Sequence, residues 1–152
     1  RYKIKIGGKT KDQLKQELES RKDIYFGNWA KDILNKMDEP NPEVQERSLV
    51  RLTVEDLGFS NGATTDEIYK RADELGLDLC PAEVGPQLRL QSDIRDWTLI
   101  GMKQIADSFG YPSVFTLRSD DEQLRLSTFD AEPDKPWISV NRWVFSIRKL
   151  GS

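Results

Sequence analysis

The sequence predicts an α+β fold, with a helical N-terminal half packed on a C-terminal antiparallel β-meander. In the first half, three segments carry apolar residues at the spacing of one helical face, each with capping residues at its start. After residue 97 the pattern changes to short segments rich in aromatic and β-branched residues, separated by turn formers. The 152 residues, 37% of them hydrophobic, suit a single domain over 1–152, helical over about 1–90 and a meander over about 97–149.

The chain begins with a predicted strand and a peripheral helix. Apolar and basic residues alternate from Tyr2 to Ile6, which is the period of a half-exposed strand near a sheet edge. Thr10 and Gln13 then form a capping box, and Leu14 and Leu18 mark the inner face of the helix that follows.

A second helix is predicted over residues 28–37. Asn28 is its expected cap, and Trp29, Ile33 and Met37 recur at four-residue spacing on one face. We therefore expect these three side chains to pack in the core.

The next segment combines a loop with a strand. Asp38 to Glu46 carries two prolines and several acids, which predicts a loop. Leu49 to Val54 alternates as a strand does, while Thr53 to Leu57 also fits a short capped helix. The sequence of Thr53–Leu57 is thus compatible with either a strand or a helix.

The central block has the clearest helix signals in the chain. Thr64 and Glu67 form a capping box, and Gly76 is a natural residue after a helix end. A further helix is expected to start near Pro81, but Pro86 lacks an N–H donor and should break it after a turn or two.

The C-terminal third is predicted to form the strands of the meander. In the last strand, Trp143, Phe145 and Ile147 alternate with Arg142 and Arg148, which places an aromatic stripe inward and the guanidinium groups outward. The predicted strand segments are Trp97–Ile105, Val114–Arg118, Gln123–Phe129 and Arg142–Lys149.

Several of these stretches resemble a family of small bacterial proteins of unknown function. They are GGKTKDQL, WAKDIL, the central LVRLTVEDLGF and GATTDEIYKRADELGLDLCPAEVGPQLRL, and the closing RWVFSIRK. The resemblance covers most of the chain and is most specific in the central block. It implies a single bacterial domain, with no known activity and no site residues to transfer. Phe109 stands where the family pattern has a polar turn residue, which argues against an ion site there.

Composition excludes several classes of function. The chain has no histidine and one cysteine, so a Ser-His-Asp or Cys-His nucleophile cannot form within it, and no metal site or cofactor is expected. The run from Gly7 to Thr10 is not a phosphate-binding loop, because Lys3 occupies the position of its first glycine. The net charge of −3 argues against general nucleic-acid binding.

Localisation follows from the absence of membrane signals in the sequence. No apolar run approaches the length of a membrane span, and the basic start is not followed by a secretory apolar segment. We expect a cytoplasmic protein with no membrane partner. The chain begins at Arg1 and not at a methionine, so the presence of a leader is left open, as is the oligomeric state.

Three candidate chemistries have simpler structural interpretations. Cys80 precedes a helix start, but a lone cysteine between apolar neighbours is more often a small buried residue. The acids of 120–122 and 130–134 could serve a carboxylate-based hydrolase, although acids in turns are usually solvated. Trp137 lies in a predicted loop and is a candidate stacking residue, against the alternative that it plugs the end of the sheet.

A helix-turn-helix is the second alternative. The spacing from Thr64 to Leu88 is similar to that motif, but the joint from Gly76 to Pro81 is too long and Pro86 interrupts the second helix. We therefore expect no specific binding to duplex DNA.

The preferred hypothesis is a non-enzymatic domain that binds a protein partner or an anionic ligand. Arginine is favoured at such surfaces because its planar fork forms paired hydrogen bonds. Catalytic residues are not assigned. The candidate binding residues are Arg118, Arg125, Arg142, Arg148 and Trp137.

Overall fold

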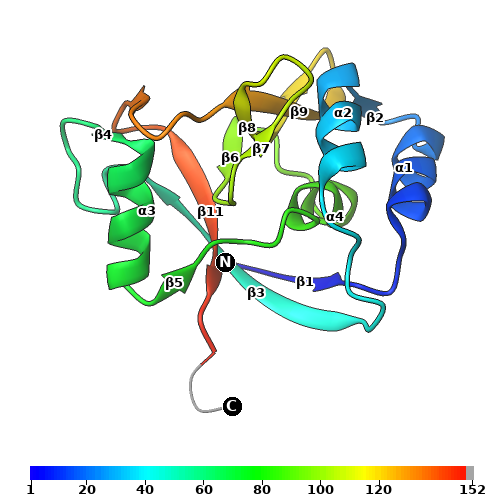
Figure 1. Ribbon diagram of the computed structural model, residues 1–152, viewed down its shortest axis with the longest axis horizontal. Helices are drawn as coiled ribbons and strands as arrows, with labels where there is room; N and C mark the ends of the chain where they lie inside the picture. The colour runs from blue at the N-terminus through cyan, green and yellow to red at the C-terminus, as the bar shows by residue number, and fades with distance from the viewer. Residues whose placement is uncertain (150–152) are drawn as a thin grey trace.

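A curled nine-stranded sheet organises the molecule, and the computed structural model describes it over residues 1–149 (Figure 1). The main path of the sheet runs β1-β3-β11-β6-β8-β9-β2, while β5 pairs with β11 and β7 pairs with β8. A separate small ladder joins β10 to β4. The strands are β1 (Tyr2–Ile6), β2 (Ile24–Phe26), β3 (Gln45–Thr53), β4 (Ala63–Thr64), β5 (Leu77–Asp78), β6 (Thr98–Ile100), β7 (Ile105–Ala106), β8 (Pro112–Asp120), β9 (Gln123–Asp130), β10 (Pro136–Trp137) and β11 (Arg142–Ile147). The helices are α1 (Lys11–Ser20), α2 (Asn28–Lys36), α3 (Thr65–Glu74) and α4 (Val84–Gln91).

The predicted division into a helical half and a C-terminal meander is wrong. Strands β1, β2 and β3 from the first half join the same sheet as the C-terminal strands. β11 lies between β3 and β6, antiparallel to the first and parallel to the second, and β2 pairs with β9 in parallel. Alternation along the sequence identifies a strand but not its partner. Pairings between the two ends of the chain therefore could not be inferred from it.

Helix α4 lies inside the curl of the sheet (Figure 1). Its residues from Val84 to Arg89 are buried, and it packs against β1, β8, β9 and α1. Gly85 allows the close approach to β8, because a Cβ there would lie 2.6 Å from the ring of Phe115. The predicted break at Pro86 does not occur, since Pro86 falls in the first turn of the helix, where its missing N–H has no intrahelical partner to lose.

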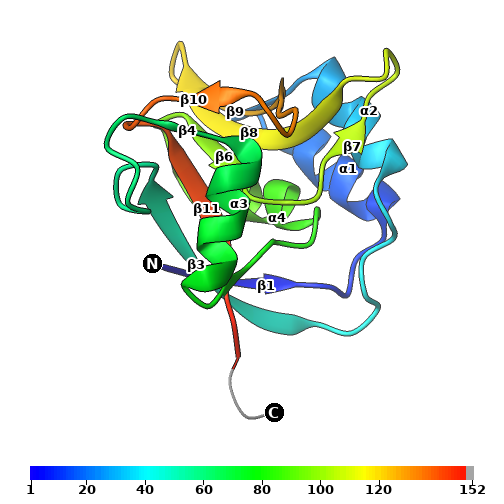
Figure 2. The same ribbon diagram turned by 60° about the vertical axis from the view of Figure 1, so that its left-hand side comes forward.

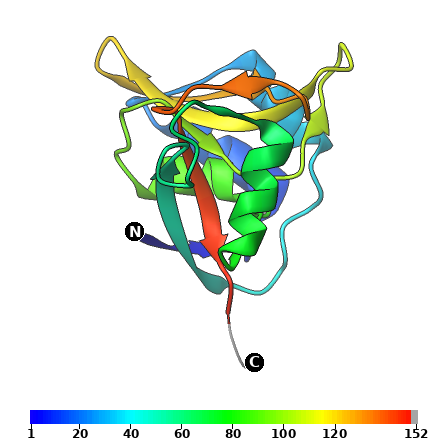
Figure 3. The ribbon, with the colours of Figure 1, turned by 90° about the vertical axis from the view of Figure 1, so that its left-hand side faces the viewer.

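Helix α3 covers the other side of β11 (Figures 2 and 3). The predicted capping box of Thr64 and Glu67 is present at its start. Tyr69 packs edge-on against Trp143 with ring centroids 5.7 Å apart, and its hydroxyl donates to the carbonyl oxygen of Met102 at 2.7 Å. Aromatic packing thus fixes α3 on the sheet.

The first half departs from its predicted elements at several points, among them β3, which begins at Gln45 inside the predicted loop Asp38–Glu46. The strand Tyr2–Ile6 and the capped helix after Thr10 are confirmed. The predicted burial of Trp29 is wrong, because its side chain is 50% exposed while Ile33 and Met37 are buried. Gly27, and not Asn28, is the cap of α2.

Beyond Thr53, the segment Thr53–Leu57 forms neither the strand nor the helix that the sequence allowed, but a turn. β3 ends at Thr53 and the chain then turns through Val54 to Gly58. Thr53 and Asp56 hold this turn, since each accepts a hydrogen bond from the backbone N–H of the other at 2.9 Å.

Within residues 1–149, none of the helices has the length and apolar character needed to cross a membrane.

Candidate functional site

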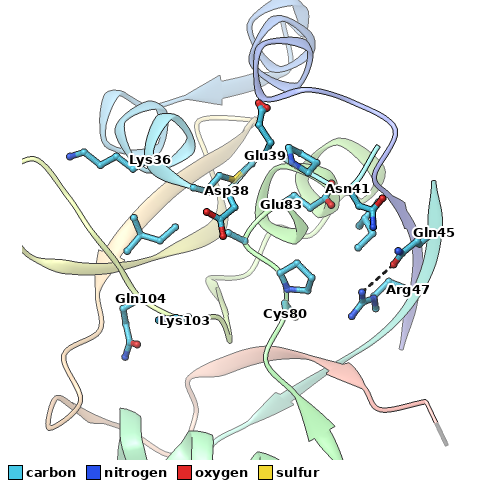
Figure 4. Close-up of a pocket in the computed structure, with 16 residues that line it drawn as sticks. Lys36, Asp38, Glu39, Asn41, Gln45, Arg47, Cys80, Glu83, Lys103 and Gln104 are labelled. Carbon is cyan, nitrogen blue, oxygen red and sulfur yellow. Dashed lines mark hydrogen bonds between the residues drawn. The ribbon is translucent and has the colours of Figure 1, made fainter. Parts of the chain in front are cut away.

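A pocket of about 580 Å³ opens beside the N-terminal end of α4 (Figure 4). Five segments far apart in the sequence form its walls. They are Ile6 at the end of β1, residues 36–41 at the end of α2 and in the loop after it, Gln45 and Arg47 on β3, residues 80–83 before α4, and residues 103–105 up to the start of β7. Pockets of this size are typical of sites for small organic molecules.

The loop at the rim is held by the start of α1. The ammonium of Lys11 donates to the carbonyl oxygens of Asn35 and Met37, both at 2.8 Å. Gly8 donates its N–H to the carbonyl oxygen of Asn41 at 2.8 Å. These bonds close the C-terminal end of α2 and fix the rim, because carbonyls at a helix end otherwise lack partners.

Glu83 is a buried carboxylate on the wall of this pocket. The residue is only 5% exposed, and its Oε2 accepts a hydrogen bond from the N–H of Gly7 at 3.0 Å. Burial raises the pKa of Glu83, and the bonds from Gly7 and Gln87 and the charge of Arg47 oppose this rise. Glu83 is therefore a hydrogen-bond acceptor whose ionised form lacks the hydration that it would have in water.

Arg47 supplies the positive charge on the same wall. Its guanidinium donates to Ser146 Oγ at 3.3 Å and to Gln45 Oε1 at 3.5 Å, the second bond drawn in Figure 4. Both acceptors are neutral. Among residues 1–149, no carboxylate oxygen lies within 4.0 Å of this guanidinium. The charge of Arg47 is thus not balanced by a direct ion pair.

Cys80 contributes a neutral thiol. It is 4% exposed, and its Sγ donates to the carbonyl oxygen of Val144 at 3.7 Å. Burial raises the pKa of this thiol to about 12, against a small opposing effect of Arg47. At neutral pH the group is protonated, so it is a weak donor and not a nucleophile.

The rim adds charged groups of both signs. Asp38 and Glu39 follow α2, and Lys103 lies across the opening in an exposed position. Figure 4 shows Asp38 directed into the hollow from above. The apolar part of the lining comes from Ile6, Met37, Pro81 and Ile105.

The predicted arginines do not form one cluster. Arg118 and Arg125 lie directly opposite each other on β8 and β9. Arg142 lies on the other face of the sheet, because it pairs in register with Thr98, which in turn pairs with Leu117, the neighbour of Arg118.

Two further candidates are committed to internal contacts. Arg148 donates to Asp78 at 2.8 Å and to Asp73 at 2.6 Å. Trp137 is 5% exposed, and its Nε1 donates to Thr65 Oγ1 at 2.8 Å. Its ring plugs the end of the sheet, so it offers no stacking surface.

Arg47 and Glu83 were missed at the sequence level. Arg47 directly follows the predicted loop Asp38–Glu46 and precedes the predicted strand Leu49–Val54, so neither pattern defines the direction of its side chain. A longer alternating run through Gln45, Arg47 and Leu49 could have placed Arg47 on an inward face. Glu83 had no sequence signal, since only the fold buries it.

The acidic turns and α4 bear on the two alternative functions. Over residues 1–149, no group of three or more acids or cysteines is arranged to hold a metal ion. Asp120 is the last residue of β8, and Asp121 and Glu122, both with positive φ, form the tight turn to β9. Helix α4, which would enter a DNA groove in a helix-turn-helix, is enclosed by the sheet.

Comparison of the chain with protein-family models, curated proteins and solved structures gives no match.

Proposed function

We propose that the protein is a non-enzymatic binding domain whose pocket beside α4 takes a small organic zwitterion. One observation carries this proposal. Arg47 and Glu83 place opposite charges on one wall of the pocket, and among residues 1–149 the hydrogen-bond partners of Arg47 are neutral.

The guanidinium of Arg47 is the group that would bind the anionic end of the ligand. A planar fork with unused donors favours a carboxylate, with which it forms paired, charge-assisted hydrogen bonds. Such a bond also gives Arg47 the direct ion pair that it lacks among residues 1–149.

Glu83 and Asp38 would bind the cationic end. Glu83 accepts one hydrogen bond, from Gly7, and its charge is buried. An ammonium group beside it would replace the hydration that burial removes. Asp38 adds a second carboxylate at the rim. The pocket of about 580 Å³ has room for an amino acid with an extended side chain or for a dipeptide.

The chemistry of the lining supports binding and not turnover. The thiol of Cys80 is protonated at neutral pH, and its Sγ–H is directed to the carbonyl oxygen of Val144. Glu83 already accepts a backbone hydrogen bond, which holds it in place as a fixed acceptor.

The test is calorimetry with amino acids and dipeptides, each compared with its carboxamide and its N-acetyl form. Removal of either charge should weaken binding by about tenfold or more, since charge-assisted hydrogen bonds contribute about 1.5–3 kcal/mol. Ligand recovered unchanged after incubation is expected of a binding domain, whereas its hydrolysis would support the enzyme alternative.

Arg47→Gln provides the decisive variant, with Arg51→Gln as its matched control. Arg51 lies on the same strand and is also half-buried, with a bond to Thr98 Oγ1 at 3.3 Å, but it does not line the pocket. Loss of binding in Arg47→Gln alone is expected. Equal affinities in both variants and the unaltered chain would contradict the proposal.

A further inference from the structure

A second charged hollow lies away from this pocket, at the paired arginines of the β8–β9 hairpin. Arg118 and Arg125 stand directly opposite each other, a cross-strand arrangement in which like charges destabilise a sheet. They line a pocket of about 380 Å³ together with Ser127, Thr128 and the first turn of α2.

Arg125 is held in place by a cation–π contact and by an ion pair with an exposed carboxylate. Its guanidinium lies over the ring of Tyr25, 4.4 Å from the centroid, and Asp120 is 3.5 Å from its Nη2. Its Nε is buried and has no hydrogen-bond partner. Asp120 is itself half-exposed, so its charge is screened by solvent. Because the Nε donor has almost no exposed surface, an anion in the hollow would contact the terminal nitrogens of Arg125 and not its Nε.

The N-terminal end of α2 adds donors to the same hollow. Its cap is Gly27, which offers no side-chain acceptor, and no acidic residue lies in its first turn. The first backbone bond to the cap comes from Lys31, which donates to the Gly27 carbonyl oxygen at 3.0 Å. The amides of Asn28 and Trp29 therefore precede the hydrogen-bonded part of the helix, where an anion is favoured.

An aromatic hollow of about 460 Å³ adjoins this site. Trp29 and Thr128 line both hollows. Trp29 is 50% exposed and packs against Phe109, which is 72% exposed, with ring centroids 5.4 Å apart. Tyr111 and Phe129 complete the aromatic lining. Exposed aromatic rings beside an anion site favour a ligand that joins a flat ring to an anionic group.

We infer that these two adjoining hollows form a site for a nucleoside monophosphate. Arg118, Arg125 and the first amides of α2 hold the phosphate, and Trp29 stacks on the base. The ligand is a phosphate monoester, because two guanidinium groups and a helix N-terminus match the charge of one dianion.

A single phosphate fits this surface better than a polynucleotide does. Asp107 and Asp130 line the aromatic hollow, and Lys135 is the only cation lining it within residues 1–149. Glu132 and Asp107 both help to keep the pKa of Asp130 raised, after the larger effect of its burial. A backbone that continued from the arginines past the base would carry its next phosphate toward these acids.

The test is a calorimetric titration of the whole chain with AMP, ribose 5-phosphate, adenosine and a decathymidylate. The site predicts that AMP binds at least about tenfold more tightly than ribose 5-phosphate or adenosine, since each lacks one of the two contacts. Equal affinity for AMP and adenosine would overturn the role of the arginines. Tighter binding of the decathymidylate than of AMP would assign the surface to single-stranded nucleic acid and overturn the inference.

Arg118→Gln is the variant of choice because Arg118 is exposed, so its loss leaves the core intact. It should weaken AMP binding by about tenfold, while Arg142→Gln, which removes a partly exposed arginine from the other face of the sheet, should not. Trp29→Ala should lower the affinity for AMP to that for ribose 5-phosphate. Unchanged AMP affinity in Arg118→Gln overturns the site.

Discussion

The carboxylate of Glu83 accepts a hydrogen bond from the main-chain N–H of Gly7, 3.0 Å away. This bond joins the turn after β1 to the residue that precedes α4, 76 positions apart in the chain. It fixes one wall of the pocket, and it holds an ionisable group where water reaches it poorly. The charge state of Glu83 therefore links folding stability to ligand binding.

Glu83→Gln should make stability less dependent on pH. The pKa of Glu83 is raised by folding, so the native state binds more protons than the unfolded state between the unfolded and folded pKa values. Stability contributed by this group is full below the unfolded pKa and falls as pH rises through the folded pKa. Glutamine keeps an acceptor for Gly7 without the charge. Urea unfolding at several pH values measures the effect, and identical pH profiles for the two chains would contradict it.

Affinity for a zwitterion should fall in acid. Protonation of Glu83 removes the negative charge that would face the ammonium group, and its raised pKa brings this loss to a higher pH than for an ordinary glutamate. Calorimetry from pH 4 to pH 8 measures the trend. In Glu83→Gln the affinity should stay low even at the pH values where Glu83 is ionised in the unaltered chain. The same dependence of affinity on pH in both chains would contradict the role assigned to Glu83.

Gly7→Ala should destabilise the fold by about 2 kcal/mol or more. Gly7 has a φ of +78°, and a Cβ there would lie 2.0 Å from the carbonyl oxygen of Glu43 and 2.9 Å from that of Asn41. Gly110→Ala is the control, since Gly110 has a φ of +86° with no atom within 4 Å of its Cβ position. Chemical denaturation compares them. Equal losses would show that the contact with the rim loop carries no cost.

Cys80 should resist modification in the folded chain. Its thiol is buried, and its pKa of about 12 leaves almost no thiolate at pH 8. Ellman's reagent should label it only after unfolding, at a rate set by the opening of the structure. Labelling of the native chain within seconds would show that the thiol is accessible.

Arg89→Met should cost about 3 kcal/mol of stability. The guanidinium is fully buried, and it donates to the carbonyl oxygens of Arg118, Arg125, Ser92 and Ile94. Burial lowers its pKa to about 10, with a further contribution from Arg95, so it remains charged at neutral pH. Arg89→Lys should also destabilise, because one ammonium cannot span four acceptors. Full stability of the lysine variant would refute this role.

Local signals predicted the helices well but not the sheet. The capping boxes at Thr10 and Thr64 and the alternation of Tyr2–Ile6 depend on neighbours in the chain, and each appears where predicted. The helix α4 was shortened in the prediction because its start was placed at Pro81, whereas a start at Val84 puts Pro86 in the first turn.

The pocket could not be predicted because its walls meet only through long-range pairing. Arg47 faces the pocket because β1 and β11 flank β3, and Glu83 is buried because α4 enters the curl of the sheet. The alternation of Gln45, Arg47 and Leu49 indicates an inward face for Arg47, but it does not identify the walls that meet there, and no local pattern indicates the burial of Glu83. The pairing of Arg118 with Arg125 is easier to predict from the sequence, because a turn of two residues fixes the register of the hairpin.

Binding of a ligand carboxylate by Arg47 can be observed at the guanidinium group itself. Proton–nitrogen NMR of the arginine Nε–Hε groups during titration with a zwitterionic ligand should shift the resonance of Arg47 and leave that of Arg51 unchanged. The Arg47 shift should saturate with the dissociation constant found by calorimetry. Shifts confined to other arginines, with Arg47 unmoved at saturation, would contradict the account.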